Sequence, residues 1–408
     1  MPASLETIKF TSAVCDAPDA RVAMDRVCAQ LASGINGTVD LAVVFVTFHH
    51  RHVLTHIHQR LAETIKPRIT LGITTQGVIG VRREIENSPG ISVLAARLPG
   101  AVLHPFAVRR DEWAGLLGSP DQLRQGLSPQ SRIGMRGFEP KAMLLLPDPF
   151  TTPVLKLIEV AEQAWPGLPV VGGMASGATQ PGANRMLLDG QVHPDGAVGL
   201  MIGGAIRVET TVSQGCRPIG RPYVITRAEK REAMVLLELG GKHALEALRE
   251  TIEGLGEQER AVVQANGLLL GRVINEYKER FGRGDFVIRQ LVGVDQEHGA
   301  LQVADPQMRV GQTVQFHTRD KKTAMEDFGM LLEVHKLDSP PAGAMLFTCN
   351  GRGMQLFDQP NADANLVADA LADAPLAGFF AAGELGPVGQ QNFVHGHTAS
   401  LVVFRQED

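Results

Sequence analysis

Three stretches of this chain repeat one order of elements: an apolar strand, a helix, a glycine-rich strand or turn, and a second apolar strand. The copies span residues 40–98, 141–202 and 342–404. Repetition of one supersecondary unit is typical of internal duplication. The pattern predicts an α/β fold, α+β in places, with mixed sheets covered by helices and repeated β-α-β-β units. The alternative is a generic α/β chain whose strands and turns merely look alike.

The apolar runs indicate which strands are central. Leu41–Val46 and Met143–Leu146 are continuously apolar, which is typical of strands covered on both faces. The helix expected at 53–65 places its apolar residues on one stripe, so one face should pack on a sheet. In the second copy, Thr152 followed by Pro153 predicts an N-cap and a first helical residue.

The chain length favours two domains. A chain of 408 residues is long for a single core. From Arg207 onward, alternating strands, a Gly240–Gly241 turn and a hairpin at 286–303 indicate a more antiparallel module, followed by an amphipathic helix at 320–334. We therefore expect one domain at 1–212, with two copies, and another at 213–408, with the antiparallel module and the third copy.

Composition excludes several classes of function. The net charge of −5 provides no basic field for nucleic acid. The N-terminal segment lacks a signal-peptide stretch, and the longest apolar run is too short to cross a membrane, so we expect a cytoplasmic protein without a membrane partner. The four cysteines have no CxxC spacing and indicate neither a zinc site nor a disulfide framework. No metal site is expected.

Several ordered motifs resemble one known family. The motif CNGRG at 349–353, the segment 378–388 and the HGHT motif at 395–398 resemble the FIST C-terminal domain. Upstream, the segments 45–50, 72–80 and 171–177 resemble the FIST N-terminal domain, and residues 214–220 resemble the segment that joins the two. The resemblance covers nearly the whole chain. The sequence departs from the family pattern at Ile73, where many members carry cysteine.

The resemblance implies a function in sensing. FIST proteins are cytoplasmic sensory modules that bind small ligands, for which amino acids have been proposed. They are often paired with histidine kinases or other signalling proteins. The resemblance therefore implies a sensory protein that binds a small molecule and acts through a separate signalling partner. No catalytic residues and no cofactor are expected under this hypothesis.

The candidate ligand site lies around the glycines of the third copy. Arg352 could clamp a ligand carboxylate, and Glu384 could accept a ligand ammonium group. The alternative is that Arg352 pairs with an internal acid such as Glu384 and pins the turn, and that Glu384 is fixed among backbone N–H groups for structural reasons. On a strand, His395 and His397 would share one face. The bends of the first two copies contribute three further candidates. The full set of candidate ligand-binding residues is Cys349, Asn350, Arg352, Glu384, His395, His397, Thr74, Thr75 and Ser176.

Two other functions stay open at this point. Some FIST proteins are haem-based nitric-oxide sensors, and His50 or His395 would then be the axial ligand. An enzyme would use Cys349 as nucleophile with His395 or His397 as base. A cysteine at the end of a strand is more often a small buried apolar residue than a reactive thiol.

Overall fold

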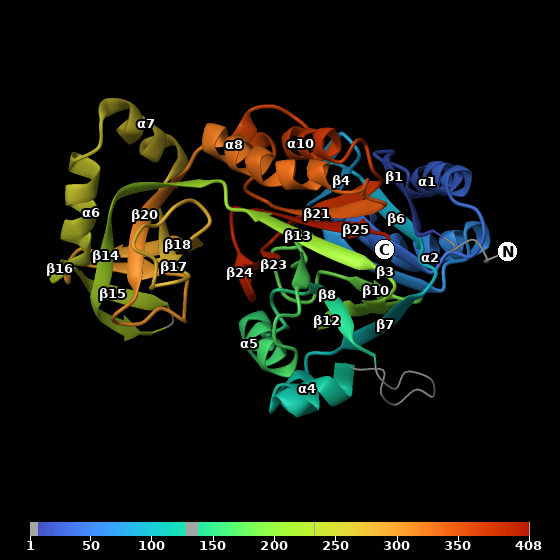
Figure 1. Cartoon of the computed structure of the whole chain (residues 1–408), viewed down its shortest axis with the longest axis horizontal. Coiled ribbons are helices and arrows are strands. Elements are labelled where there is room, and N and C mark those ends of the chain that lie inside the picture. Colours follow the sequence, from blue (N-terminus) through green and yellow to red (C-terminus); the bar gives the residue numbers. More distant parts are fainter. Residues whose placement is uncertain (1–6, 128–137, 232, 408) are drawn as a thin grey trace. The chain divides into compact units, whose positions relative to one another are not determined.

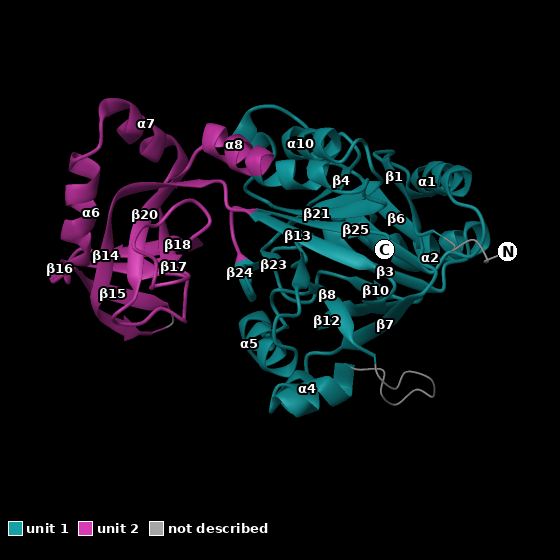
Figure 2. Ribbon diagram, in the orientation of Figure 1, with its two compact units in different colours: residues 1–212, 331–394, 399–408 teal, residues 213–330, 395–398 magenta. Residues whose placement is uncertain are grey.

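In the computed structural model, the described residues are 7–127, 138–231 and 233–407 (Figure 1). The chain divides into two compact units (Figure 2). Unit 1 comprises Met1–Val212, Leu331–Val394 and Ala399–Asp408, and unit 2 comprises Ser213–Met330 and His395–Thr398. Within the described part of the chain, no helix combines the length and the apolar character needed to span a membrane.

Unit 1 contains the three copies, each preceded by one further strand. The first copy and its leading strand comprise β1 (Lys9–Cys15), α1 (Ala20–Gly34), β2 (Leu41–Thr47), η1 (Phe48–Val53), α2 (Leu54–Thr64), β3 (Ile69–Thr75), β4 (Gly77–Gly80), β5 (Arg83–Glu86) and β6 (Ile91–Arg97). The second comprises β7 (Ala101–Val108), α3 (Trp113–Leu116), α4 (Pro120–Leu127), β8 (Pro140–Pro147), α5 (Val154–Ala164), β9 (Val170–Gly173), β10 (Met186–Leu188), β11 (Gln191–His193) and β12 (Ala197–Gly204).

The third copy is interrupted by unit 2. Its leading strand β13 (Arg207–Ser213) runs into unit 2, and the chain returns to unit 1 within α8 (Lys321–Leu332). The copy then comprises η3 (Glu333–Leu337), β21 (Gly343–Cys349), α9 (Met354–Phe357), α10 (Ala362–Ala370), β22 (Leu376–Ala381), β23 (Glu384–Val388), β24 (Gln391–His395) and β25 (Ala399–Arg405). Unit 2 is thus an insertion between the leading strand and the first central strand of this copy.

The strands of every copy pair in the same way. The central strand pairs in parallel with the strand after the helix and antiparallel with the last strand. This holds for β2 with β3 and β6, for β8 with β9 and β12, and for β21 with β22 and β25. The predicted mixed sheets and repeated β-α-β-β order are therefore confirmed, and β2 and β8 are internal strands as predicted.

The copies exchange hairpins in a closed cycle. The β4–β5 hairpin of the first copy extends the sheet of the third, where β4 pairs with β22. The β23–β24 hairpin of the third copy joins β9 of the second, and the β10–β11 hairpin of the second joins β3 of the first. Each six-stranded sheet therefore combines four strands of one copy with two strands of another.

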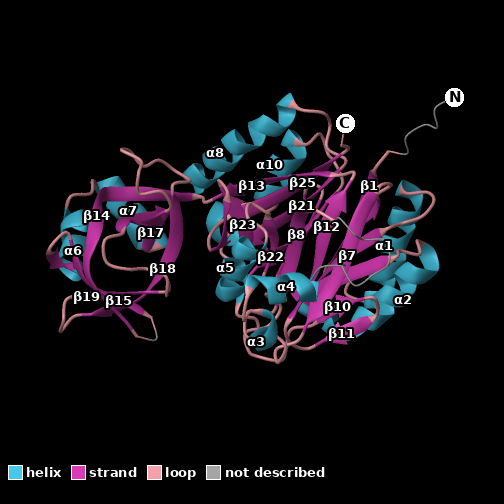
Figure 3. Cartoon of the chain, turned by 60° about the horizontal axis from the view of Figure 1, so that its bottom comes forward, coloured by secondary structure: helices cyan, strands magenta, loops and turns pink. Residues whose placement is uncertain are grey.

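The three sheets share one apolar core. Phe45 of the first copy packs on Phe347 and Phe379 of the third, with ring centroids 6.1 and 5.0 Å away. Leu144 of the second copy belongs to the same core. The helices α1 and α2 cover the outer face of the first sheet, and α5 covers that of the second (Figure 3). The predicted stripe on α2 is confirmed, since Leu54, Ile57 and Leu61 are buried there.

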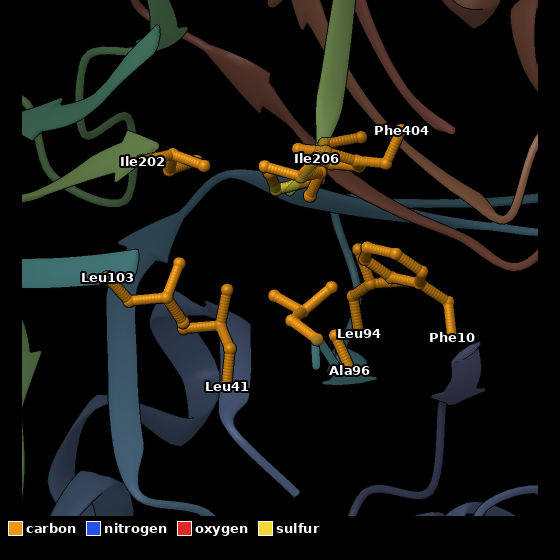
Figure 4. Close-up of a pocket in the computed structure, with 10 residues that line it drawn as sticks. Phe10, Leu41, Leu94, Ala96, Leu103, Ile202, Ile206 and Phe404 are labelled. Carbon is orange, nitrogen blue, oxygen red and sulfur yellow. The ribbon is translucent and has the colours of Figure 1, made fainter. Parts of the chain in front are cut away.

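A small apolar cavity lies in this core (Figure 4). Its volume is about 10 Å³, and Phe10, Leu41, Met345 and Phe404 are among its lining residues. A volume near that of one water molecule, without polar partners, suits neither a water nor a metabolite. This cavity is a packing defect and not a ligand pocket.

Unit 2 is a small β-barrel with the helices α6 (Ala244–Glu253) and α7 (Glu257–Asn266) and most of α8. Its strands are β14 (Cys216–Lys230), β15 (Met234–Leu239), β16 (Lys242–His243), β17 (Leu269–Val273), β18 (Phe286–Asp295), β19 (Ala300–Val303) and β20 (Thr313–Arg319). The strands follow the order β14-β20-β17-β18-β19-β15-β16, and pairing of β14 with β15 closes the barrel. The predicted antiparallel module and its 286–303 hairpin are confirmed.

The expected N-cap of α5 is wrong. The helix begins at Val154, Pro153 occupies the N-cap position, and no side chain caps it. The Thr152 hydroxyl instead donates to the Gly196 carbonyl at 2.7 Å. This bond ties the start of α5 to the beginning of β12, a contact distant in sequence that a local motif does not reveal.

One hydroxyl joins all three copies where their exchanged segments meet. Ser176 of the second copy is buried. Its oxygen accepts a hydrogen bond from the Gln76 backbone N–H of the first copy at 2.9 Å and donates to the Phe380 carbonyl of the third. A single side chain therefore satisfies backbone groups of both neighbouring copies.

We expect Ser176→Ala to destabilise the protein by about 1–3 kcal/mol, because the Gln76 N–H and the Phe380 carbonyl would each lose a partner inside the protein. Urea denaturation measures the change in the free energy of unfolding. Ser33→Ala is the matched control, since the Ser33 hydroxyl is exposed at the end of α1. Equal stability of the two variants would contradict the role assigned to Ser176.

Candidate functional site

The three copies end their central strands differently. In the first copy, β2 ends at Thr47, whose buried hydroxyl accepts the Gly90 N–H at 2.8 Å. In the second, the buried Asp148 follows β8 and accepts hydrogen bonds from the Thr151 hydroxyl at 2.6 Å and the Asn184 amide at 2.9 Å. In the third copy, β21 ends at Cys349 in a turn whose first three residues are half-buried, whereas Arg352 and Gly353 are buried.

This turn, residues 349–353, exposes three kinds of polar group. The Cys349 thiol, the Asn350 amide and the Gly351 backbone are half-buried. The Gly351 N–H donates to the Cys349 sulfur at 3.4 Å, and the Arg352 N–H donates to the Cys349 carbonyl at 2.9 Å. The turn lies at the carboxyl end of the parallel pair β21 and β22, where open α/β sheets commonly bind ligands.

Asn350 connects the turn to the junction of the copies. Its backbone N–H donates to the Ala381 carbonyl at 3.0 Å. In the amide orientation that satisfies its neighbours, the side-chain nitrogen lies 2.8 Å from the Phe380 carbonyl and 3.3 Å from Gln76 Oε1. The 349–353 turn therefore lies beside Gln76 of the first copy, which the Asn350 side chain contacts.

Arg352 is fully buried and faces an acid that the sequence analysis did not single out. Its Nε and Nη2 donate to the Asp363 carboxylate at 2.8 and 2.7 Å, and the Thr348 hydroxyl donates to the same carboxylate at 2.7 Å. The guanidinium also lies 5.1 Å from the centre of the Phe357 ring. Asp363 lies at the start of α10, so this bidentate pair fixes the turn against that helix.

The other predicted residues of unit 1 are also buried. Glu384 begins β23 opposite Gly173 of β9. The Thr74 hydroxyl accepts the Arg185 N–H at 2.9 Å, and the Thr75 hydroxyl donates to the Val46 carbonyl at 3.3 Å. The Thr74 bond joins the first and second copies, whereas the Thr75 bond stays within the first copy.

The predicted histidines occupy different surroundings. His395 and His397 belong to the stretch 395–398 of unit 2, whereas the turn belongs to unit 1. Their predicted common strand face is wrong, because β24 ends at His395 and His397 has a left-handed φ of 65°. Among the residues that the structure describes, no three His, Cys, Asp or Glu side chains gather as a metal site.

His50 does not suit haem ligation in this structure. It follows β2 within η1 and is buried, and its Nε2 lies 3.3 Å from the Ala17 carbonyl. Burial lowers the pKa of His50, so the ring is neutral at neutral pH. An iron atom at Nε2 would have to displace the Ala17 contact and open the packing around the ring.

Two glutamates from the exchanged hairpin hold the turn and the next helix. Glu84 and Glu86 lie on β5 of the first copy. Glu86 accepts the Met354 N–H at 3.0 Å, directly after the turn, and Glu84 accepts the Ala364 N–H at 2.8 Å in the first turn of α10. Gly353 has a φ of 58°, and a Cβ there would lie 2.5 Å from Glu86 Oε1. Only glycine fits this position.

Glu84 and Asp363 both interact with the Arg352 guanidinium, and Glu84 and Glu86 also interact electrostatically with Asp363. Burial, with a contribution from the Asp363 charge, raises the pKa of Glu84 to about 8. Burial also raises the pKa of Glu86. Glu84 is therefore largely protonated at neutral pH, which lowers the repulsion between its carboxyl group and Asp363.

Comparison with known proteins assigns the chain to a family. The family model of the FIST N domain matches residues 40–242, and that of the FIST C domain matches residues 244–387. This chain belongs to the FIST family. It is a family of sensory and signal-transduction proteins, and the recognition from the sequence motifs is confirmed.

Two mycobacterial FIST relatives cover almost the whole chain. The uncharacterized protein Rv0628c of Mycobacterium tuberculosis (strain H37Rv) is 38% identical over 396 residues, which is 96% of this chain and 98% of the relative. The uncharacterized protein Mb0898c of Mycobacterium bovis is also 38% identical over 396 residues, 96% of this chain and 97% of the relative. Neither name states a ligand or a partner.

The FIST domain boundary falls inside unit 2. The FIST N match ends after β15, and the FIST C match begins at α6. Of the barrel strands, β14 and β15 therefore lie in the FIST N match, and β17, β18, β19 and β20 lie in the FIST C match. The family division separates sequence segments, whereas the compact units reflect which strands pair in the fold.

We expect Asp363→Asn to lower the free energy of unfolding by about 3–5 kcal/mol, because it leaves the buried Arg352 guanidinium without its carboxylate. Thermal or urea denaturation would measure this loss. Asp369→Asn on the same helix is the control, since Asp369 is exposed and pairs with Arg82 at the surface. An Asp363→Asn variant as stable as that control would contradict a structural role for the pair.

Protonation of Glu84 should make stability depend on pH. Its pKa is raised in the folded state, so its contribution is fully present below its unfolded pKa near 4.5 and is lost as pH rises toward 8. The free energy of unfolding should fall across this window by up to about 1.4 kcal/mol per pH unit. Glu84→Gln should remove this component, whereas Glu139→Gln, at an exposed position, should keep it. Identical pH profiles for wild type and Glu84→Gln would refute the assignment.

Proposed function

We propose that this FIST protein is a cytoplasmic sensory protein that binds a small ligand at the 349–353 turn and reports to a separate signalling protein. The ligand is of the amino-acid class or a related metabolite, and a histidine kinase is one type of partner. The observation that carries the proposal is the position of the third turn. Its half-buried residues Cys349, Asn350 and Gly351 lie at the carboxyl end of the parallel pair β21 and β22, where open α/β sheets commonly bind ligands.

The chemistry of the turn suits a small polar ligand. The Asn350 amide both donates and accepts hydrogen bonds, and the Gly351 backbone lacks a side chain that would keep a ligand away. Arg352 and Asp363 lie beneath these groups and fix the backbone, so little conformational entropy is lost on binding. Fixed polar groups in a small area are typical of sites that recognise a metabolite by orientation.

The hairpin exchange provides a route for the signal. The turn belongs to the third copy, but Glu86 of the first copy accepts the Met354 N–H directly after it, and Gln76 of the first copy lies beside Asn350. A ligand that favours one arrangement of the turn would therefore shift the β4–β5 hairpin, which continues directly into the first sheet. Such a ligand acts by its different affinity for two conformations. This mechanism requires binding without turnover.

A screen of amino acids by thermal shift tests the proposal. At a concentration 100-fold above its Kd, a ligand should add about 2.7 kcal/mol of stability. Asn350→Ala should weaken this response at least tenfold, and Asn36→Ala, at an exposed position before β2, should leave it unchanged. Absence of a response to every amino acid, or an equal response in both variants, would contradict binding at the turn. A Soret band in the purified protein would favour the haem alternative instead.

A further inference from the structure

Unit 2 carries a hollow that neither the sequence motifs nor the turn explains. It lies between the start of α6 and the connection from β18 to β19, with a volume of about 360 Å³. This volume lies within the range of roughly 300–1,000 Å³ that is typical of small-molecule sites. The charged and histidine side chains that line it are His243, Glu246, Arg249, Glu297 and His298.

The two walls of the hollow are fixed to each other. The Leu245 N–H in the first turn of α6 donates to the Gly299 carbonyl at 2.9 Å. Gly299 has a φ of 61°, and a Cβ there would lie 3.1–3.2 Å from His243 atoms, so the His243 side chain packs directly on this backbone. A side chain at position 299 would push the walls apart.

One histidine of the lining is oriented by an acid. His298 Nδ1 lies 2.9 Å from Asp295 Oδ2, and the His298 N–H donates to Asp295 Oδ1 at 3.0 Å. The carboxylate favours the proton on Nδ1, so Nε2 is the ring atom left to accept a hydrogen bond from a ligand donor. The ring is thus held in one orientation before any ligand arrives.

The charges around the hollow do not neutralise one another. Arg249, Glu246 and Glu297 form no ion pair with any residue in the described part of the chain, although Lys242 and Glu250 at the same end of unit 2 pair at 2.5 Å. The lining therefore offers one permanent cation and two carboxylates. Its electrostatic complement is a molecule with one anionic group and two cationic groups.

We propose that this hollow is a second ligand site, specific for a small zwitterion that carries one carboxylate and two basic nitrogen groups. Arg249 binds the carboxylate, Glu246 and Glu297 bind the cationic groups, and His298 Nε2 accepts a hydrogen bond from a ligand N–H. The site is independent of the 349–353 turn and does not rest on the function proposed for it.

Isothermal titration calorimetry of the full chain tests this site with L-lysine and L-arginine as probes. We expect saturable binding that Arg249→Glu weakens at least tenfold and that Glu297→Gln weakens severalfold. Arg260→Glu is the matched control, because Arg260 is an exposed arginine on α7 outside the hollow, and it should bind as the wild type does. 1,5-Diaminopentane, which is L-lysine without its carboxylate, should bind at least tenfold more weakly than L-lysine.

The Asn350→Ala variant separates the two sites. If it binds L-lysine and L-arginine normally while Arg249→Glu does not, the hollow is the binding site. If Asn350→Ala abolishes binding and Arg249→Glu has no effect, the heat arises at the turn and the second site is refuted, while the proposed function stands. No saturable binding of either probe by the wild type would also refute the second site. That result would not decide whether other amino acids bind at the 349–353 turn.

Discussion

Backbone hydrogen bonding between copies is the constraint on which unit 1 depends. Each copy supplies four strands to its own sheet and a hairpin to the next, in the cycle of β4 with β22, β23 with β9 and β10 with β3. A hairpin that left its host sheet would expose unpaired N–H and C=O groups on both sides. No copy can therefore complete its sheet alone, and the apolar core around Phe45, Phe347 and Phe379 forms only when all three are assembled.

This exchange also accounts for the different surroundings of the three strand ends. The strand ends at Thr47 and Asp148 are closed by bonds to neighbouring segments, whereas the third turn is held from beneath by Arg352 with Asp363 and from the side by Glu86. The first residues of this turn, Cys349, Asn350 and Gly351, are half-buried. The third copy is also the one that carries unit 2 as an insertion, so the candidate site and the barrel share one host copy.

Local patterns predicted the elements well but not the partners of the side chains. The apolar runs of β2 and β8, the stripe on α2 and the 286–303 hairpin depend on periodicity within one segment, and each is confirmed. Asp363 and Glu84 were missed. An acid near the start of a helix or on a short hairpin has no local sequence pattern that reveals which distant side chain it contacts. Thr152 shows the opposite error, since an N-cap hydroxyl accepts a backbone N–H, whereas the Thr152 hydroxyl instead donates to the Gly196 carbonyl, 44 positions away.

The sequence by itself determined the family, the α/β class, the three-copy order and the glycine-rich turn at 349–353, because these depend on residue type and spacing along the chain. The tertiary structure alone decided that the copies exchange hairpins and that unit 2 interrupts the third copy. It also decided that Asp363 of α10 pairs with Arg352 and that Glu84 of β5 lies in the same electrostatic environment. The physical reason is that hydrogen bonds between strand edges and burial of charge depend on which distant segments meet, and the pattern within a segment does not encode its neighbour.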